Sequence, residues 1–471
     1  MKGADVNLRH RRGVLEFALA VTASFVILAA CASPAPAGGS PAPAGGTPAP
    51  GGTAPVSQEP VATATEDPVD AALEAGGTIT YWTWTNAEPQ VEAFEKEYPN
   101  VDVKLANVGT AQDHYTKLQN VIAAGSGAPD VAQVEYYALP QFALPGHLVD
   151  LRQFGFDQLA TDFTPSDWAA ARVGEGLYGL PQGGGPMVLF YNKRIFDEHD
   201  LTVPTTWDEF LANARKLKES DPTKYFTGDP GEPGQDLGLI WQAGGRPFKV
   251  DGTRIAINFD DEGTARWTAI WNQLLAEDHL APSPHWTEEW FAGLADGTIA
   301  TLPFGGWQAG VFAAFEDGVG DWRVAPMPTY DGGETVSSHH GGSNQAVLEQ
   351  SKSPALAAGF LRWLNHEEGA TVYRELGGFP ATVADLTDPE FIDHEWEFFG
   401  GQQVNQLIVE AAEQVGEGWQ FLPYQSYANS IFGDTAGQSF LSKSDINVGL
   451  KAWQDALIDY GNQQGFEVDG G

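Results

Sequence analysis

Hydrophobic positions with strand spacing and with helix spacing alternate along the chain from Gly76 onward. Residues 78–84 are rich in β-branched and aromatic side chains, and residues 101–105 alternate apolar with polar positions, so both segments are predicted as strands. The apolar positions that recur at helical spacing after these strands are Val91, Phe94 and Tyr98, then Tyr115, Leu118, Val121 and Ile122. Strands followed by helices predict a parallel sheet covered by helices.

The same alternation continues through the rest of the chain. Residues 187–191 form a short apolar run typical of a strand, and Thr206 with Glu209 makes a capping box that opens a helix through Glu219. Later helices are predicted from the spacing of Trp267, Ile270, Trp271, Leu274 and Leu275, from Ser353-Pro354 onward, and over residues 445–460. The sequence therefore predicts an α/β protein that is long enough for two domains of ordinary size.

The start of the chain carries a predicted export signal. A basic segment precedes an apolar run over residues 17–30, and Cys31, the only cysteine, follows Leu28-Ala29-Ala30. This segment resembles the lipobox of exported bacterial lipoproteins, which implies a signal peptide over residues 1–30 and acylation of Cys31. The alternative is a transmembrane helix, but the run is shorter than the ~20 residues that span a bilayer. Arg11-Arg12 also resembles a twin-arginine signal, so the export route stays open.

Residues 31–75 are predicted as a disordered tether that begins with the lipidated Cys31. From Ala32 to about Pro68 the chain is almost all Pro, Ala, Gly, Ser and Thr, and it lacks aromatic residues. Such a composition cannot bury enough apolar surface to offset the entropy lost on ordering. Alternating Pro with Ala and Gly favours an extended, flexible path that holds the folded body away from the membrane.

The chain is strongly acidic, with 63 Asp and Glu residues against 25 Lys and Arg residues and a formal net charge of −38. Nucleic acid is therefore not an expected partner, because its phosphate backbone requires a basic patch. An anionic membrane surface is excluded for the same reason, so the lipid anchor is the only expected membrane contact. A solvated acidic surface explains most of these charges. Several tryptophans and tyrosines are more informative, because they lie in Gly- and Pro-rich loops without an obvious core position.

Short motifs follow one another in a specific order along the folded part. They are residues 77–82 as a first strand, 127–131 leading to Glu135, 179–181 followed by 189–193, 205–210, 296–300 followed by 305–307, and 341–343. No single motif is specific. Their order and spacing, behind a lipobox and a tether, resemble the extracellular solute-binding proteins of ABC importers, in particular the carbohydrate-binding group that includes maltose-binding protein.

The resemblance implies a two-lobed periplasmic-binding-protein-like fold, in which each lobe is a mostly parallel sheet flanked by helices and three hinge crossings join the lobes. The implied N-terminal lobe comprises residues 76–185 with 330–377, and the implied C-terminal lobe comprises residues 186–329 with 378–471. Glycines near these crossings tolerate the backbone changes of a hinge, although they also suit ordinary loops. They are found at 183–185, 332–333 and 377–378.

A sugar presents a weakly apolar face and a rim of hydroxyls, so its site needs flat aromatic rings with donors and acceptors at their edges. Trp84 ends one predicted strand and Glu135 follows another, and the crevice of a doubly wound sheet lies at such strand ends. Similarity to the family implies that Trp307 and residues 341–343 face the ligand from opposite lobes. The predicted ligand-binding residues are Trp84, Glu135, Tyr137, Tyr191, Trp241, Trp307, Gly342, Ser343, Asn344 and Tyr424. The alternative for each aromatic residue is a place in the core.

Two other classes of function stay open. A glycosidase needs two facing carboxyl groups, and Glu135 is the only carboxylate that the sequence places in the cleft. The chain shows no nucleophile elbow, Walker loop, HExxH motif or Cys/His metal spacing, so we predict neither an enzyme nor a cofactor. Tyr136-Tyr137 and His339-His340 suggest metal capture, but consecutive residues on a strand point to opposite faces. The acidic chain also suits a polyamine.

The predicted function is capture of a sugar or oligosaccharide by cleft closure and its delivery to the permease subunits of an ABC transporter. We expect a monomer that is anchored by Cys31 to the outer face of the cytoplasmic membrane or held in the periplasm. The sugar, its length and its linkage are not specified by any motif.

Overall fold

The computed structural model describes residues 67–471. The predicted signal peptide, Cys31 and the greater part of the predicted tether lie outside these residues. Within the described part, no helix is both long enough and apolar enough to cross a membrane.

The first lobe is built on three parallel strands. Strands β2 (Val101–Ala106), β1 (Gly77–Trp82) and β3 (Val131–Glu135) pair in that order, and β13 (His339–Val347) joins β3 in the antiparallel sense. Alternate residues fill two cores: Ile79 and Val131 pack on one face, Ala132 and Val134 on the other. The helices of this lobe are α1 (Pro68–Ala75), α2 (Glu88–Glu97), α3 (Ala111–Ala124), α4 (Leu139–Ala143), α5 (Pro165–Ala170), α12 (Pro354–His366) and α13 (Glu368–Glu375), with 3-10 turns η1 (Tyr136–Ala138), η2 (Leu151–Phe154) and η3 (Phe156–Asp162) and a small hairpin β4 (Arg172–Val173) and β5 (Gly176–Leu177).

The second lobe repeats this plan. Strands β10 (Leu280–Ala281), β7 (Tyr225–Gly228) and β11 (Ile299–Gly305) are parallel, and β12 (Trp322–Ala325) pairs with β6 (Leu180–Asn192). Its helices are α6 (Lys193–Glu198), α7 (Trp207–Ser220), α8 (Pro233–Gln242), α9 (Glu262–Ala276), α10 (Glu288–Asp296), α11 (Gln308–Ala313), α15 (Pro389–Ile392), α16 (Val404–Glu413), α17 (Gln425–Ser430), α18 (Gly437–Ser442) and α19 (Ile446–Gln463), with the 3-10 turn η4 (Glu397–Phe399). The short helix α14 (Val383–Leu386) contacts both α13 of the first lobe and α15. A separate sheet contains β8 (Phe248–Asp251), β9 (Arg254–Ile257) and β14 (Glu467–Asp469).

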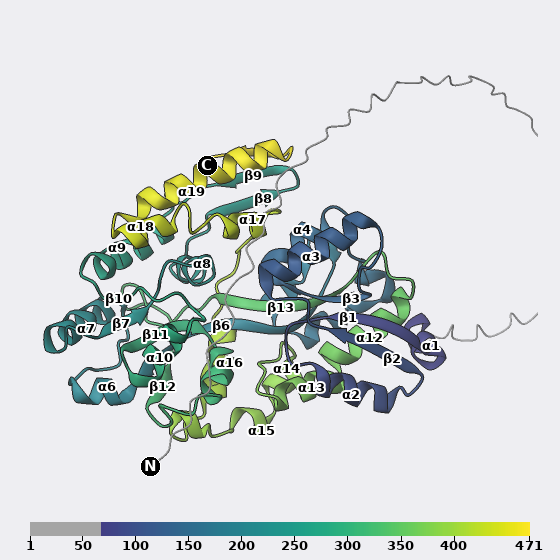
Figure 1. Ribbon diagram of the computed structural model, residues 1–471, viewed down its shortest axis with the longest axis horizontal. Helices are drawn as coiled ribbons and strands as arrows, with labels where there is room; N and C mark the ends of the chain where they lie inside the picture. Colours follow the sequence, from purple (N-terminus) through teal and green to yellow (C-terminus); the bar gives the residue numbers. More distant parts are fainter. Residues whose placement is uncertain (1–66) are drawn as a thin grey trace, which may run out of the picture. The chain divides into compact units, whose positions relative to one another are not determined.

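Strand β6 joins the two lobes. Its first half pairs with β13 as far as Pro186, and its second half, from Met187, pairs with β11. Strands β6 and β13 run side by side between the two groups of helices in Figure 1. Because one strand belongs to both lobes, the sheet is continuous from β10 to β2. The two-lobed α/β architecture that the sequence predicted is confirmed.

The six helices that local signals predicted are all present, as α2, α3, α7, α9, α12 and α19. The Thr206 hydroxyl accepts from the Glu209 N–H at 3.2 Å and begins α7, as expected of a capping box. The Glu209 carboxylate returns to the Thr205 N–H at 2.8 Å, one residue earlier than the usual pattern. Helix α3 ends at Gly125, which adopts the left-handed conformation with φ of 67°.

The end of the predicted tether is a helix, which corrects that boundary. Asp67 caps α1 by accepting from the Val69 N–H at 2.8 Å, and Pro68 occupies its first turn. Val69 and Leu73, one helical turn apart, are buried beside α12. This short helix is stabilised by packing against α12, which lies far away in the sequence. The composition of the segment alone gave no sign of that contact.

The second crossing between the lobes lies after residue 330, where the sequence predicted it. Tyr330 packs against the second lobe's core, and the neighbouring Thr329 N–H donates to the Thr205 carbonyl at 2.9 Å. The Ser338 carbonyl still accepts from the Met187 N–H at 2.8 Å, directly before β13 begins. These contacts favour a boundary near Ser338, and the remaining predicted boundaries stay predictions.

We predict that Gly185→Ala destabilises the protein. A Cβ at this position would lie 2.1 Å from the His340 carbonyl oxygen, a backbone atom of β13 that already accepts the Trp307 indole N–H. We expect the free energy of unfolding, measured by urea titration, to fall by about 2–3 kcal/mol. Gly433→Ala is the matched control, because a Cβ there meets no atom within 4 Å. Equal stability of the two variants would contradict the close approach of the strands.

Candidate functional site

The carboxyl ends of the parallel strands in both lobes meet at the crossing of β6 and β13. Glu135, the last residue of β3, pairs with Ser343, and Gly305, the last residue of β11, pairs with Met187. Met187 and Ser343 lie on the two strands that join the lobes. The loops that follow β1, β3, β7, β10 and β11 therefore form the facing walls of a cleft, which is where ligands bind in doubly wound sheets.

Tyr115 of α3 organises the first wall. Its hydroxyl donates to Glu135 Oε2 at 3.1 Å and accepts from the Glu135 N–H at 2.9 Å. The rings of Trp84 and Tyr137 both meet the Tyr115 ring edge-on, at centroid distances of 6.1 Å and 6.0 Å. Ser343 adds a hydroxyl that accepts from Gln133 Nε2 at 3.0 Å. This wall thus combines aromatic surface with hydrogen-bonding groups.

Glu135 has an unusual charge state for a carboxyl group. Burial raises the pKa of Glu135 to about 7, although hydrogen bonds from Tyr137 and Tyr115 oppose the shift. Burial acts in this direction because it disfavours the charged carboxylate. Near neutral pH the group can therefore both donate and accept hydrogen bonds.

Two indoles form the centre of the second wall. Trp307, half-buried at the start of α11, donates from Nε1 to the His340 carbonyl at 2.7 Å. Its ring stacks on that of Trp286, with centroids 5.8 Å apart and planes inclined by 20°. The bond to His340 ties this aromatic platform to the beginning of β13, the strand that crosses to the first lobe.

Polar groups lie beside these indoles. Glu232 Oε2 is 3.0 Å from His285 Nδ1, and its Oε1 accepts from the His285 N–H at 3.2 Å. The His340 ring contacts Phe304 edge-on at 4.0 Å, and burial lowers the pKa of His340 to about 3, so the ring is neutral. A neutral imidazole carries one donor and one acceptor. The second wall therefore also offers hydrogen-bonding partners at the edge of its rings.

The two walls come together around a small cavity of about 40 Å³. Tyr137 of the first lobe faces residues of α8 and the late segment of the second lobe, among them Gly234, Trp241, Trp419, Gln425 and Asn429. Trp241 and Trp419 stack face to face at 5.0 Å, and η1 lies against α17. Ligand pockets usually measure ~300 Å³ or more, so this part of the cleft must widen to admit a ligand.

Three of the predicted site residues lie away from the cleft. Tyr424 is buried in the second lobe's core, where its hydroxyl donates to the Leu457 carbonyl at 3.1 Å. Tyr191 lies five residues beyond the crossing and packs on Phe196 at 5.1 Å. Asn344 is fully buried inside the sheet. We leave these three out of the candidate site, because their side chains are committed to packing within a lobe.

Gly342 and Trp241 have structural roles beside the cleft. Gly342 has φ of 102°, and a Cβ on it would lie 2.4 Å from the Tyr136 ring, so it permits a close approach of two segments. Trp241 is largely buried and donates from Nε1 to the Gly416 carbonyl at 2.5 Å, but part of it lines the small cavity.

Sequence reasoning missed four residues of the walls: Glu232, His285, Trp286 and Trp419. Glu232 and Trp286 lie in Pro-containing loops directly after strands β7 and β10. Their position after strands is the same signal that identified Trp84 and Glu135, but β10 is only two residues long and β7 only four. Neither strand stands out as a hydrophobic run.

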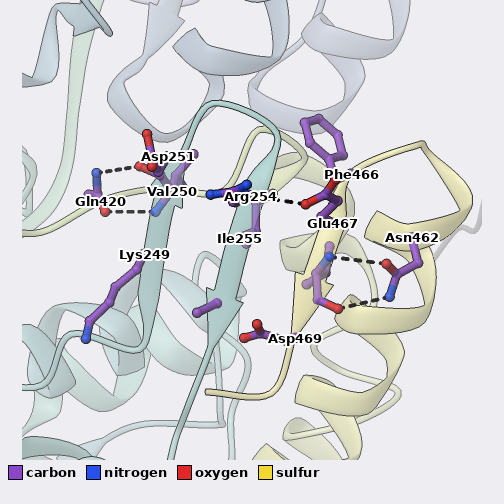
Figure 2. Close-up of a pocket in the computed structure, with 12 residues that line it drawn as sticks. Lys249, Val250, Asp251, Arg254, Ile255, Gln420, Asn462, Phe466, Glu467 and Asp469 are labelled. Carbon is purple, nitrogen blue, oxygen red and sulfur yellow. Dashed lines mark hydrogen bonds and ion pairs between the residues drawn. The ribbon is translucent and has the colours of Figure 1, made fainter.

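A hollow of about 810 Å³ is a surface feature of the three-stranded sheet (Figure 2). Four of its polar side chains contact the sheet itself. Gln420 bonds to both the N–H and the carbonyl of Val250, Asn462 does the same for Val468, and Arg254 pairs with Glu467 at 3.4 Å. With these groups already engaged, the hollow is a weaker candidate than the cleft.

A third cavity, of about 240 Å³, lies beside Trp307 and is lined by α11, α13 and α16. Its main cationic group, Arg374, pairs with Asp388 at 2.5 Å and with Asp385 at 3.6 Å. The Trp396 indole donates to Asn405 at 3.1 Å. These groups stabilise the segment that follows the third crossing, and the cleft retains the richer set of exposed rings.

Comparison with known proteins identifies similar chains. The family model described as bacterial extracellular solute-binding protein matches residues 76–371. The ABC transporter associated binding protein from B. animalis subsp. lactis Bl-04, solved in complex with β-1,6-galactobiose, is 37% identical with a TM-score of 0.77; the match covers 83% of this chain and 99% of that one. The galacto-N-biose-/lacto-N-biose I-binding protein from Bifidobacterium longum is 28% identical with a TM-score of 0.74, covering 84% and 99%. The arabinooligosaccharide-binding protein of Halalkalibacterium halodurans is 24% identical, covering 78% of this chain and 86% of that one.

We predict that Glu135 makes stability pH-dependent. Its folded pKa of about 7 lies above the ordinary value of 4.5, so the native state holds a proton that the unfolded chain releases. This contribution to the free energy of unfolding is complete below pH ~4.5 and is lost as pH rises to ~7. The free energy of unfolding can be measured by urea titration at both pH values. Between pH ~4.5 and ~7 it should fall by about 1–2 kcal/mol less in Glu135→Gln than in the wild type.

The exposed glutamate Glu92 on α2 gives the matched control, Glu92→Gln. That variant should keep the wild-type dependence on pH. If Glu135→Gln also keeps it, the raised pKa of Glu135 is contradicted.

Proposed function

The chain belongs to the bacterial extracellular solute-binding protein family, and we propose that its cleft captures a short oligosaccharide for an ABC importer. The observation that carries the proposal is the bond from Trp307 Nε1 to the His340 carbonyl, at 2.7 Å. It fixes a flat apolar ring to β13, the strand that also carries Ser343 of the first wall. A ring that faces the C–H surface of a sugar, with polar groups at its edge, matches the chemistry of that ligand.

We assign the ligand contacts to both walls. Trp84, Glu135, Tyr137 and Ser343 supply the first wall, and Trp307 with part of Trp241 supplies the second. Gly342 keeps the backbone close enough for these groups to meet. The relatives that bind β-1,6-galactobiose, lacto-N-biose and arabinooligosaccharide support a ligand of two or more sugar units.

Binding is coupled to closure in this proposal. A ligand that touches both walls has extra affinity for the closed form and shifts the equilibrium by that difference alone. The small cavity between Tyr137 and Asn429 would widen as the lobes open and admit the sugar. On closure the two walls would approach each other again around the bound ligand. The closed form is then the state that the permease recognises.

The proposed role is binding without catalysis. Each wall does carry a carboxyl group, Glu135 or Glu232, and a glycosidase would need two such groups to face each other at roughly 5–10 Å. Each is already engaged, Glu135 with Tyr115 and Glu232 with His285. Incubation with β-1,6-galactobiose followed by chromatography tests this point, because release of galactose would establish hydrolysis.

Metal capture by Tyr136 and Tyr137 is less well supported than sugar binding. The Tyr136 hydroxyl is buried and donates to Asp167 at 3.0 Å, whereas Tyr137 lies on the cleft wall. The two phenols therefore have different surroundings. Among residues 67–471 no group of three or more His, Cys, Asp or Glu side chains is arranged to hold a metal ion.

Trp307→Ala should abolish ligand-induced stabilisation. In a thermal-shift panel of oligosaccharides on residues 67–471, a ligand at ~100 times its Kd should add about 2.7 kcal/mol to the wild type. The variant removes the ring and should show no shift. Trp307→Phe keeps an aromatic face and should retain part of the ligand-induced stabilisation. An undiminished response of Trp307→Ala would exclude Trp307 from the site.

Lipid anchoring through Cys31 has its own test. We propose that the thiol carries the lipid, because Cys31 follows Leu28-Ala29-Ala30 and has no other cysteine to pair with. In bacterial cells, the wild type should partition into the detergent phase of Triton X-114, and Cys31→Ser should move to the aqueous phase. Retention of the variant in detergent would contradict anchoring at this residue.

A further inference from the structure

Trp286 stands out among the tryptophans because half of its surface, 51%, is exposed. It lies in the loop between β10 and α10, at the carboxyl end of a strand that faces the cleft. A large exposed ring loses the stabilisation that burial would provide. Its position on the cleft wall therefore calls for a role other than core packing.

The backbone at Trp286 is strained. Its φ of 67° falls in the left-handed region, which is unfavourable for a bulky side chain by about 1–2 kcal/mol. Residues on both sides hold the loop in this conformation. Glu232 binds both the N–H and the ring of His285, and the Thr287 hydroxyl accepts from the Trp290 N–H at 3.3 Å to cap α10. The ring of Trp286 is thus positioned before any ligand arrives.

The Trp286 and Trp307 rings lie side by side in an offset stack. Their centroids are 5.8 Å apart and their planes differ by 20°. With planes ~3.5–4.0 Å apart, the rings are displaced sideways by roughly 4–5 Å. Trp286 also rests on Trp290, at a centroid distance of 5.4 Å, which supports it from the lobe's core. The result is a stepped aromatic surface that is longer than one indole.

We infer that Trp286 is a second stacking platform, which contacts the sugar unit next to the one on Trp307 and makes the protein select oligosaccharides over monosaccharides. The inference rests on the proposed function and adds a determinant of ligand length to it. A monosaccharide on Trp307 gains nothing from Trp286, whereas a second unit gains apolar contact with a ring that is already in place. Preorganisation of that ring reduces the entropy lost on binding.

Isothermal titration calorimetry with galactose, β-1,6-galactobiose and β-1,6-galactotriose, together with arabinose and its linear di- and trisaccharide, tests the inference. Trp286→Ala should weaken the Kd for di- and trisaccharides at least tenfold and change the Kd for the monosaccharide less than twofold. Trp286→Phe should restore most of the affinity. Leu441→Ala, which removes another exposed apolar side chain far from the cleft on α18, should change nothing.

Thermal unfolding without ligand confirms that each variant is folded. If Trp286→Ala loses affinity equally for sugars of every length, or for none of them, the role of Trp286 is overturned. The proposed function stays intact in that case, provided that the wild type binds. If the wild type binds none of these sugars, the proposed function fails for this panel and the inference fails with it.

Discussion

The pairing of β6 with β13 at the junction of the lobes is the constraint on which the rest of the structure depends. The Gly185 N–H donates to His339 Nδ1 at 3.0 Å, and a Cβ at Gly185 would strike the His340 carbonyl. That same carbonyl accepts the indole N–H of Trp307. The contact that brings the crossing strands together thus also fixes the main aromatic ring of the cleft, so the hinge and the proposed binding surface share atoms.

This arrangement explains how binding and closure can be coupled without a long chain of intermediates. Trp307, the proposed sugar platform, is joined by one hydrogen bond to the strand that enters the first lobe. The opposite wall is connected to the same strand equally directly, because Glu135 pairs with Ser343 of β13. A ligand that contacts either wall more strongly in the closed form therefore bears directly on the crossing strands. Those strands are the element that must change conformation between the open and closed forms.

The cleft also keeps its polar groups uncharged or paired despite the acidity of the chain. Burial raises the pKa of Glu135 and lowers that of His340, so both groups favour their neutral forms. Glu232 is balanced by its contact with His285. A neutral, hydrogen-bonding surface between aromatic rings suits an uncharged ligand such as a sugar better than an ion, since burying an unpaired charge is costly.

The sequence by itself determined several of the longer helices and strands, whereas the short strands β7 and β10 left no recognisable signal. Hydrophobic period, the Thr206 cap and the Gly125 terminus are properties of short windows, and they predicted α7 and α3. Strand ends led to Trp84 and Glu135, and the family resemblance led to Trp307. Only the tertiary structure decided which loop residues face one another. Glu232 and His285 meet across 53 positions of sequence, and Tyr424 enters a core formed by distant helices. Such encounters depend on the packing of whole layers, so no local spacing encodes them.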